Sequence, residues 1–585
     1  MPQHAGAVGG SGAPEIDEGL ISTTLYVSPD PLLGNDLNPG TENQPLATIT
    51  KAFNLYNGGT GGYKIILLPG IHRPGAIAAT QALSIPGVLS ATRPLIIEGA
   101  GWSPGLHTGD VILSGSEDWS GGWTVAGSEN GRTAYEKAWP YDWGLSTNIF
   151  EPNFTPPDTV RTYHQVVVDG VVYYEVLNAA DPHVANVADS EGYFYVDESS
   201  NFIRVVPPAA FADLNGALVE VSVRRTLLRF FRSQTETSPT PLAVRNIVFR
   251  HAAPGLASGA FRSQNHNGFI IEDCRFHQNK NRGIVLEGNS ASSFTLRRCA
   301  IAESGTTGGG FNAVGALVED CLFEANSRQA DVSQYYGWDY GGFKMGASSN
   351  STFRNVVARN NYGIGFWFDT ACRGILVEDC LSEGNSTTGI FIENNNRNNL
   401  SGLGSDTTVE VRRTTLRANI QTSPQNFVTG RGLYITESEN VVIDDCVIED
   451  NTIQIRVSDG PGRGPVSNIQ LSNSNIRATD SSQALIIAGG NTSWTEFINT
   501  YSPLSDFNTW YYPGSTIAFP DASRNITLDL DGWKALVGAE PNSTWDGVSI
   551  EVIIETSLDG INWTPTTDGL HDITQTGAFF RLRIE

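Results

Sequence analysis

Two short segments of the sequence resemble each other, and each ends in an acidic residue. GFWFD spans residues 365–369, and GIFIE spans residues 389–393. Successive side chains of a β-strand point to opposite faces, so inward-pointing Phe and Ile side chains leave Asp369 and Glu393 pointing outward. Neighbouring strands lie ~4.8 Å apart, which predicts carboxyl groups roughly 5 Å apart if the two segments pair. Retaining glycosidases place a nucleophile and an acid/base at about this separation, ~5–5.5 Å.

The same alternation places further side chains in one outward-facing column. Applied to the related segments, it predicts a column of Glu287, Asn312, Lys344, Asp369, Glu393 and Thr436. Lys344 precedes Asp369 by one repeat and would stabilise its carboxylate, which suits a nucleophile. The like charge of Asp369 favours the protonated form of Glu393, which suits a general acid/base. A single outward acid is more often a solvated surface group, and it is the pair on adjacent strands that favours catalysis.

Aromatic residues surround the acidic pair and indicate a surface on which sugar rings stack. Three of them point outward in the register of the acids: Trp367, Phe391 and Tyr434. The segment SRQADVSQYYGWDYGG, residues 327–342, interrupts the repeat and places Tyr336 and Trp338 in a loop. We interpret these two aromatics as a wall of the binding site and Asp339 as a ligand for sugar hydroxyls. Packing of the loop on the barrel explains the same residues about equally well.

These segments belong to a repeat that recurs every 22 to 25 residues where no loop intervenes. Five repeats are marked by a polar pair followed by cysteine, at Cys274, Cys299, Cys321, Cys380 and Cys446. Val356 and Thr414 fill the same position in two further repeats. Five residues after it comes an asparagine, with Ser304 as the one exception, and glycine recurs near the ninth; the asparagines are Asn279, Asn326, Asn361, Asn385, Asn419 and Asn451. Asparagine at such a turn can bond to its copy in the next coil. A fixed period of short alternating strands without a helical pattern predicts an all-β chain with a right-handed parallel β-helix.

The cysteine column is best explained as a stack of small buried hydrophobic side chains. Whole coils separate the cysteines, which argues against the disulfide framework of a small secreted domain. Paired C-x-x-C spacing for a metal is missing from the sequence, so no metal or other cofactor is predicted.

The repeat and its interruptions divide the chain into parts. The expected ranges are a flexible N-terminal lead at 1–23, a cap with a short helix and the first coils at 24–115, an inserted β-rich subdomain at 116–228, the main β-helix with the catalytic face at 229–500, a segment packing on the last coils at 501–545, and a small module of antiparallel strands at 546–585.

The composition narrows the class of partner. The chain has 585 residues with 62 glycines, 17% charged residues and a net charge of −25. Nucleic acid and anionic membranes are not expected partners, because both are bound through Lys and Arg. The sequence has no run of ~18 apolar residues, and its start, MPQHAGAVGGSGAPE, lacks the basic end and apolar core of a signal peptide. Localisation therefore stays open, with secretion or a periplasmic location expected if the N-terminus has been trimmed.

The chain resembles bacterial right-handed β-helix proteins of the pectate-lyase-like superfamily, and in particular glycoside hydrolases of the β-xylosidase kind (glycoside hydrolase family 120) and their fucosidase- and xylanase-like relatives. The resemblance covers most of residues 24–545 and is carried by YVSPDPLLGNDLNPGTENQPLATITKAF, VVVDGVVYY, GYFYVDE, GGFK, GFWFD, GIFIE, DFNTWYYP and LDGWKALVG. Those β-xylosidases use an Asp nucleophile and a Glu acid/base on the following coil, which implies these roles for Asp369 and Glu393. The segment TACRG after Asp369 differs from the xylosidase pattern, so the sugar is left open.

Two alternatives to a retaining glycoside hydrolase of plant or algal saccharides remain. A polysaccharide lyase on the same fold would need a uronate substrate and a base, for which Lys344 is the candidate, although the acidic pair would repel a uronate. In a non-catalytic carbohydrate-binding or adhesion β-helix the column would be structural, and the change Asp369→Asn would be harmless or stabilising.

Overall fold

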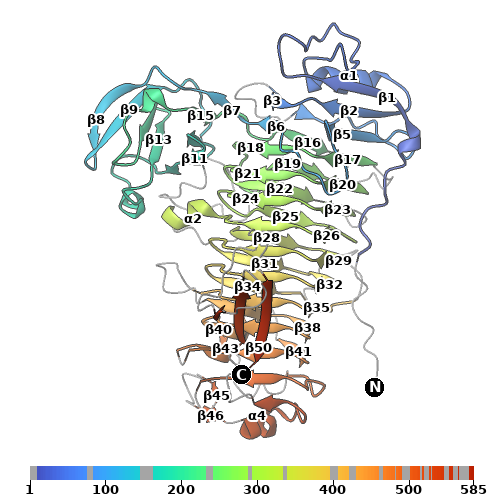
Figure 1. Cartoon of the computed structure of the whole chain (residues 1–585), viewed down its shortest axis with the longest axis vertical. Coiled ribbons are helices and arrows are strands. Elements are labelled where there is room, and N and C mark those ends of the chain that lie inside the picture. The colour runs from blue at the N-terminus through green and yellow to red at the C-terminus, as the bar shows by residue number, and fades with distance from the viewer. Residues whose placement is uncertain are drawn as a thin grey trace.

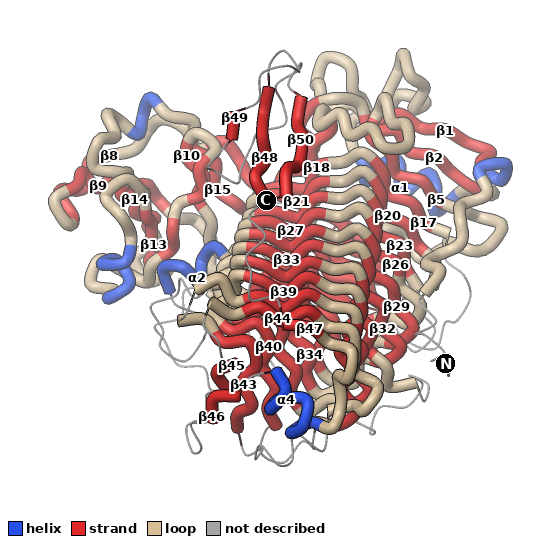
Figure 2. Tube along the Cα trace, turned by 60° about the horizontal axis from the view of Figure 1, so that its bottom comes forward, coloured by secondary structure: helices blue, strands red, loops and turns tan. Residues whose placement is uncertain are grey.

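The computed structural model is a solenoid whose coils stack along one axis and build three parallel sheets (Figure 1, Figure 2). The structure describes residues 10–75, 83–144, 162–231, 241–265, 267–287, 293–333, 339–395, 406–420, 430–459, 466–480, 482–490, 501–513, 517–519, 526–528, 530–545, 552–557, 564–565 and 579–584. The predicted all-β parallel β-helix is confirmed.

Each regular coil contributes one strand to each sheet. Sheet 1 has 12 strands: β1 (Ile21–Val27), β2 (Gly62–Leu67), β5 (Leu95–Gly99), β17 (Leu242–Arg245), β20 (Phe269–Glu272), β23 (Phe294–Arg297), β26 (Leu317–Glu319), β29 (Ser349–Arg354), β32 (Arg373–Glu378), β35 (Val409–Arg412), β38 (Glu439–Asp444) and β41 (Ser467–Ser472). Sheet 2 has 13: β3 (Gly70–His72), β6 (Val111–Ser114), β18 (Val248–Arg250), β21 (Arg275–His277), β24 (Ala300–Ala302), β27 (Leu322–Glu324), β30 (Val357–Arg359), β33 (Leu381–Glu383), β36 (Thr415–Arg417), β39 (Val447–Glu449), β42 (Asn475–Arg477), β44 (Thr509–Tyr511) and β47 (Thr544–Trp545). Sheet 3 has 11: β4 (Leu83–Ser84), β16 (Leu228–Phe231), β19 (Gly259–Gln264), β22 (Arg282–Glu287), β25 (Gly309–Asn312), β28 (Gly341–Gly346), β31 (Ile364–Asp369), β34 (Thr388–Glu393), β37 (Arg431–Thr436), β40 (Ile453–Asp459) and β43 (Ala484–Gly490).

An asparagine ladder runs through the interior between the coils. The side-chain amide Nδ2 of each member donates to the Oδ1 of the next at 2.8–3.0 Å, in the order Asn326, Asn361, Asn385, Asn419 and Asn451. All five side chains are buried, and the backbone N–H of one residue bonds to the same Oδ1 as its own amide. The ladder therefore satisfies polar groups that would otherwise be unpaired inside the solenoid, as the recurring asparagine predicts.

The recurring glycine is explained by its distance from this ladder. A Cβ on Gly365 would lie 2.6 Å from the carbonyl oxygen of Gly389 and 2.9 Å from the Nδ2 of Asn385. A Cβ on Gly389 would lie 2.8 Å from the Nδ2 of Asn419. Only glycine lets β31 and β34 approach the asparagines this closely, so the ladder fixes the position of both strands.

The six cysteines are free thiols, and all are buried. The five that mark the repeat stack in the hydrophobic interior, which confirms their predicted packing role.

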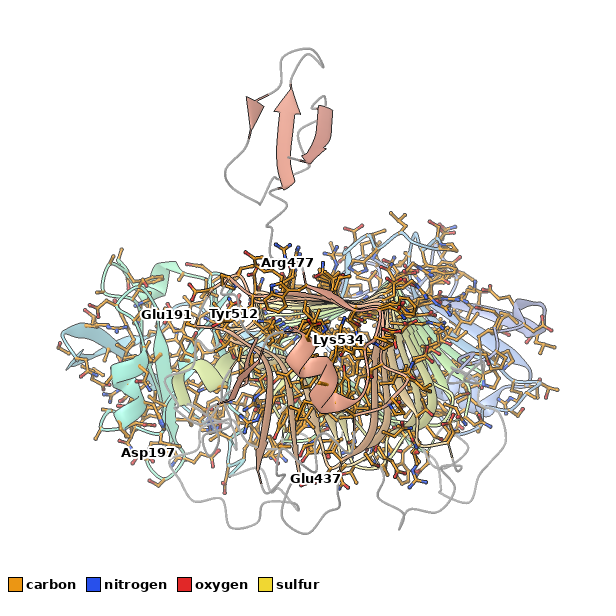
Figure 3. The ribbon with its side chains drawn as sticks, turned by 90° about the horizontal axis from the view of Figure 1, so that it is seen from below. Glu191, Asp197, Glu437, Arg477, Tyr512 and Lys534 are labelled. Carbon is orange, nitrogen blue, oxygen red and sulfur yellow. The ribbon has the colours of Figure 1, made fainter. Side chains whose placement is uncertain are left out.

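Helices close the two ends of the solenoid. At the start, α1 (Ile49–Gly58) begins at the N-cap Thr48 and buries Ile49, Ala52, Phe53 and Tyr56 against the first strands, as predicted. At the other end lies α4 (Leu530–Val537), which contains the residue Lys534 labelled in the view along the axis (Figure 3). Its residue Trp533 is fully buried and packs edge-to-face on Tyr501. The first and last coils are thus covered rather than left open.

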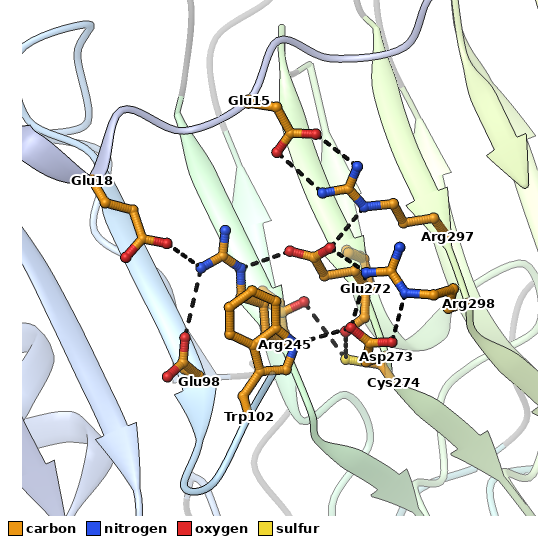
Figure 4. A network of polar contacts seen from close by, with 12 residues as sticks. Glu15, Glu18, Glu98, Trp102, Arg245, Glu272, Asp273, Cys274, Arg297 and Arg298 are labelled. Atoms are coloured by element: carbon orange, nitrogen blue, oxygen red, sulfur yellow. Dashed lines mark hydrogen bonds and ion pairs between the residues drawn. The ribbon is translucent and has the colours of Figure 1, made fainter. Parts of the chain in front are cut away.

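Residues 10–20, which we call the N-terminal strap, lie against the outer face of sheet 1 (Figure 4). The N–H of Gly12 donates to the carbonyl oxygen of Gly315 at 3.2 Å, and the N–H of Ala13 donates to Thr295. Ala13 and Ile16 are buried against three side chains of the sheet: Ile96, Ala243 and Ile270. This part of the expected flexible lead is therefore packed, because its apolar residues and backbone groups find partners on the sheet.

Ion pairs fix the strap at two further points. Glu15 binds Arg297 at 2.6 Å, and Glu18 binds Arg245 at 2.6 Å and Lys64 at 2.8 Å. The strap ends in the short 3₁₀-helix η1 (Glu18–Leu20), which leads directly into β1.

The inserted subdomain contains two small sheets beside the solenoid, at the left of Figure 1 and marked by Glu191 and Asp197 in Figure 3. The four-stranded sheet contains β7 (Ser116–Asp118), β10 (Val166–Val168), β11 (Val171–Val172) and β15 (Val219–Ser222). The five-stranded sheet contains β8 (Thr124–Glu129), β9 (Arg132–Ala138), β12 (Tyr174–Glu175), β13 (Tyr193–Asp197) and β14 (Phe202–Val206). Short helices accompany them: η3 (Pro182–Asn186), η4 (Leu214–Gly216) and, from the solenoid, α2 (Arg328–Ser333).

A buried charge cluster joins this subdomain to the solenoid. The two ring nitrogens of His164 lie 2.9 Å from a carboxylate oxygen of Glu175 and 3.1 Å from one of Glu198. Lys280, from the solenoid, also binds Glu175. Burial alone would lower the pKa of His164, but the hydrogen bonds to Glu175 and Glu198 outweigh it and raise the pKa. Because both nitrogens face acceptors, His164 is held as an imidazolium.

We expect this cluster to make stability depend on pH. The pKa of His164 is raised in the folded protein, so its stabilising contribution is complete below the ordinary value of 6.5 and is lost as pH rises through the folded value. The thermal midpoint of unfolding should therefore fall as the pH rises above about 6.5, and it should fall less in the variant His164→Gln. His277→Gln, which changes a partly exposed histidine beside Glu303, is the control. An equal fall in wild type and His164→Gln would contradict this role.

The C-terminal residues form small antiparallel sheets, as predicted. β45 (Ile517–Phe519) pairs with β46 (Ile526–Leu528), and β48 (Val552–Ser557) lies between β49 (Thr564–Pro565) and β50 (Phe579–Ile584). None of the helices in the described ranges is long and apolar enough to cross a membrane.

Candidate active site

Asp369 and Glu393 lie at the ends of neighbouring strands on the outer face of sheet 3. β31 and β34 pair in parallel with Phe368 opposite Ile392, which places the next residues, the two acids, opposite each other. The inward neighbours Phe368 and Ile392 are fully buried, which fixes which face the acids occupy. Because neighbouring strands lie ~4.8 Å apart, this register places the two carboxyl groups roughly 5 Å apart.

The predicted column is wrong at Lys344. In the structure Lys344 lies opposite Trp367, and Gly346 lies opposite Asp369. The prediction aligned Lys344, the only charged residue of its segment, with the acids. The position that aligns with them is Gly346, which has no side chain to mark it. The long lysine side chain nevertheless extends along the strand and reaches the acid column.

Both carboxylate oxygens of Asp369 have a partner. The Nζ of Lys344 lies 2.9 Å from Oδ2, and the Oγ1 of Thr370 donates to Oδ1 at 2.7 Å. The same Nζ lies 3.7 Å from the centre of the Trp367 ring. The side chains of Lys344 and Asp369 are only 12% and 20% exposed, so the ion pair is partly shielded from water. These contacts favour a charged carboxylate with a fixed orientation.

Glu393 is oriented by a different group. The indole Nε1 of Trp367 donates to the Oε2 of Glu393 at 3.0 Å. Trp367 therefore touches both halves of the pair, with Lys344 over its ring and Glu393 at its edge. One acid receives a full positive charge and the other a neutral N–H donor, which gives two carboxyl groups in different environments.

An aromatic column runs beside the acids, one outward position earlier on each strand. Register places Lys344, Trp367, Phe391 and Tyr434 in line across β28, β31, β34 and β37. Phe391 stacks on Trp367 at 5.5 Å between ring centres and on Tyr434 at 4.6 Å with the rings nearly parallel. Because the rings stack on one another, the column presents ring edges rather than open ring faces beside the carboxyl pair.

The other predicted site residues fall into three groups. Glu287 and Asn312 lie in the acid column as predicted, three and two strands before Asp369, and Glu287 is paired with Arg262 at 2.9 Å. Asp339 is fully buried and bound to Arg282 at 2.9 Å, which removes it from the surface where a sugar would bind. Tyr336 and Trp338 lie outside the described residues.

Three contact residues were missed from the sequence. Thr370 donates to Asp369, and Arg431 and Arg456 lie over the ring of Tyr434. Arg456 could have been found, because IQIRVSD continues the alternation one coil beyond Tyr434 and points Arg456 outward. Arg431 carries no such signal, since it precedes the glycine at which the alternation is interrupted.

Comparison with known proteins supports the fold. Residues 244–408 match the protein family described as a right-handed β-helix region. No curated protein matches the chain. A solved structure of XylC in complex with xylose is similar over 91% of this chain and 87% of XylC, with a TM-score of 0.60 and 14% identity.

Two further solved structures are more distant. A glycoside hydrolase covers 84% of this chain and 96% of its own, with a TM-score of 0.46 and 12% identity. The A-module of the mannuronan C-5 epimerase AlgE4 from Azotobacter vinelandii covers 85% and 94%, with a TM-score of 0.40 and 10% identity. At these identities the likeness concerns architecture: this chain has the right-handed, pectate-lyase-like β-helix fold.

Proposed function

We propose that the protein is a retaining glycoside hydrolase with Asp369 as nucleophile and Glu393 as general acid/base. The observation that carries the proposal is the pair of carboxyl groups on adjacent strands, one bound to Lys344 and the other to Trp367. A separation of roughly 5 Å leaves no room for a water molecule between acid and sugar, as an inverting enzyme requires.

In this mechanism the Asp369 carboxylate attacks the anomeric carbon of the sugar. The bond from that carbon to the leaving oxygen breaks, and Glu393 donates its proton to that oxygen. Glu393, now a carboxylate, removes a proton from water, and the resulting oxygen nucleophile displaces Asp369 from the anomeric carbon. Lys344 and Thr370 hold Asp369 for the attack, and the aromatic column forms an apolar border beside the reacting sugar.

The overall similarity to XylC supports a carbohydrate substrate and leaves the sugar and linkage open. The polysaccharide-lyase alternative has less support. Lys344, its candidate base, is already engaged in an ion pair with Asp369 and lies over the ring of Trp367.

The proposal is tested by the stereochemistry of hydrolysis. We expect the protein to hydrolyse at least one of a panel of aryl xylosides, fucosides, galactosides and arabinosides, and proton NMR to show that the first sugar product keeps the anomeric configuration of the substrate. Inversion would exclude Asp369 as nucleophile. Release of unsaturated uronate products from a uronate polymer, without aryl glycoside hydrolysis, would favour the lyase.

A further inference from the structure

Two arginines next to the candidate site differ from most arginines on the outer faces of the solenoid. Many of those elsewhere are paired with acids, as where Glu378 binds Arg412 at 2.8 Å. In the part of the chain that the structure describes, no carboxylate lies within ion-pair distance of Arg431 or Arg456. The Nε atoms of both are buried and have no hydrogen-bond partner.

Both guanidinium groups face the same end of the aromatic column. The Cζ of Arg431 lies 4.4 Å from the centre of the Tyr434 ring, and that of Arg456 lies 5.5 Å from it. Arg456 is opposite Tyr434 in register, so it continues the column by one strand. The hydroxyl of Tyr434 bonds to Ser458 at 2.8 Å, which fixes the ring beside the two cations.

Two neighbouring cations destabilise the folded protein when no ligand is bound. Arg431 is only 8% exposed. Burial, together with the neighbouring charge of Arg456, lowers the pKa of Arg431 to about 10, which still leaves it charged at neutral pH. The buried cation of Arg431, beside a second cation on the half-buried Arg456, is unfavourable without a counter-charge, and cation–π contact with one ring offsets only part of that cost. In a chain of net charge −25, two such arginines at one site indicate that a bound anion completes it.

We infer that Arg431 and Arg456 form a subsite for an anionic substituent, a carboxylate or a sulfate ester, on a sugar unit next to the one cleaved at Asp369 and Glu393. The inference rests on the proposed glycosidase site, whose substrate it narrows to an acidic or sulfated oligosaccharide. Arg456 lies two strands beyond Glu393, or about 10 Å at ~4.8 Å per strand. This separation keeps the anion away from the two acids, and guanidinium groups match the planar, multidentate geometry of such oxyanions.

The test compares binding of charged and uncharged ligands in the Asp369→Asn background, so that no turnover is needed. The probes are a glucuronic-acid-substituted xylo-oligosaccharide, a sulfated galacto-oligosaccharide and their unsubstituted parents, titrated by calorimetry. We expect one charged probe to bind at least about tenfold more tightly than its parent. Arg431→Met and Arg456→Met should each remove that advantage and leave the affinity for the parent unchanged. Which charged probe responds distinguishes a carboxylate from a sulfate.

A matched control is Arg477→Met, because Arg477 also lies over a tyrosine, Tyr511, on the opposite-facing sheet 2. It should leave every affinity unchanged. Removing an unpaired cation should not lower the thermal midpoint, whereas a fall in Arg431→Met would show that the cations are structural. Charged probes that bind no better than their parents, or that bind the arginine variants equally well, would overturn the inference. Binding needs no hydrolysis, so these outcomes are separate from failure of the proposed activity.

Discussion

The variant Asp369→Asn is expected to lose at least about 10⁴-fold in kcat on the best aryl glycoside, equivalent to about 5 kcal/mol of barrier. An amide cannot form the glycosyl ester, and the ion pair with Lys344 is lost as well. Glu393→Gln should lose about 10²–10⁴-fold, and less with leaving groups that need no proton. Steady-state kinetics on substrates with good and poor leaving groups measures both effects.

Rescue by azide and a control variant of a third acidic residue complete that experiment. Added azide should give a glycosyl azide of inverted configuration with Asp369→Asn, where it replaces the nucleophile, and of retained configuration with Glu393→Gln, where it attacks the glycosyl ester without a base. Glu287→Gln is the control, because Glu287 lies in the same acid column but is paired with Arg262. It should keep nearly wild-type activity. Wild-type activity in Asp369→Asn would exclude Asp369 as the nucleophile, whereas a wild-type protein inactive on every substrate would favour the non-catalytic β-helix.

The largest effect on stability is expected for Asn385→Ala, which should lower the free energy of unfolding by about 3 kcal/mol or more. Asn385 accepts from the backbone and side chain of Asn361 and donates to Asn419, Ser382 and the carbonyl of Ala358. Alanine leaves several of these groups buried and unpaired. Chemical denaturation followed by circular dichroism measures the change.

Asn54→Ala is the control for that substitution, since Asn54 is exposed on α1. It should change stability by less than about 0.5 kcal/mol. A similarly small effect at Asn385 would mean that the interior ladder contributes little. Because the ladder also positions β31 and β34, a partly folded Asn385→Ala protein should lose activity more than its folded fraction predicts.

The parts of the molecule that repeat could be predicted from the sequence. Alternation along GFWFD and GIFIE was enough to place Asp369 and Glu393 on one face, because the neighbouring Phe and Ile side chains have only the interior to occupy. The recurring asparagine likewise predicted a ladder. Periodic patterns report the environment of each position, and a solenoid keeps that environment from coil to coil.

Contacts that depend on a single position could not be predicted in the same way. Asp339 was interpreted as a sugar ligand, but it is buried against Arg282, a residue from a different coil that nothing in the sequence connects to it. The misplacement of Lys344 has the same origin, since its column is set by a glycine rather than by its own charge. Non-repeating pairs are formed by the packing of loops and long side chains, which the period does not encode.

The N-terminal strap has a consequence for how the protein folds and unfolds. In a linear array each coil contacts only its neighbours, and coils can melt one after another from an end. The strap contacts Lys64 near its own end and Gly315 near its start, so fraying of any coil between them also breaks strap contacts. The coils under the strap should therefore melt as one cooperative block. During synthesis residues 10–20 must wait for about three hundred later residues before they can dock, so this early segment is among the last to reach its place.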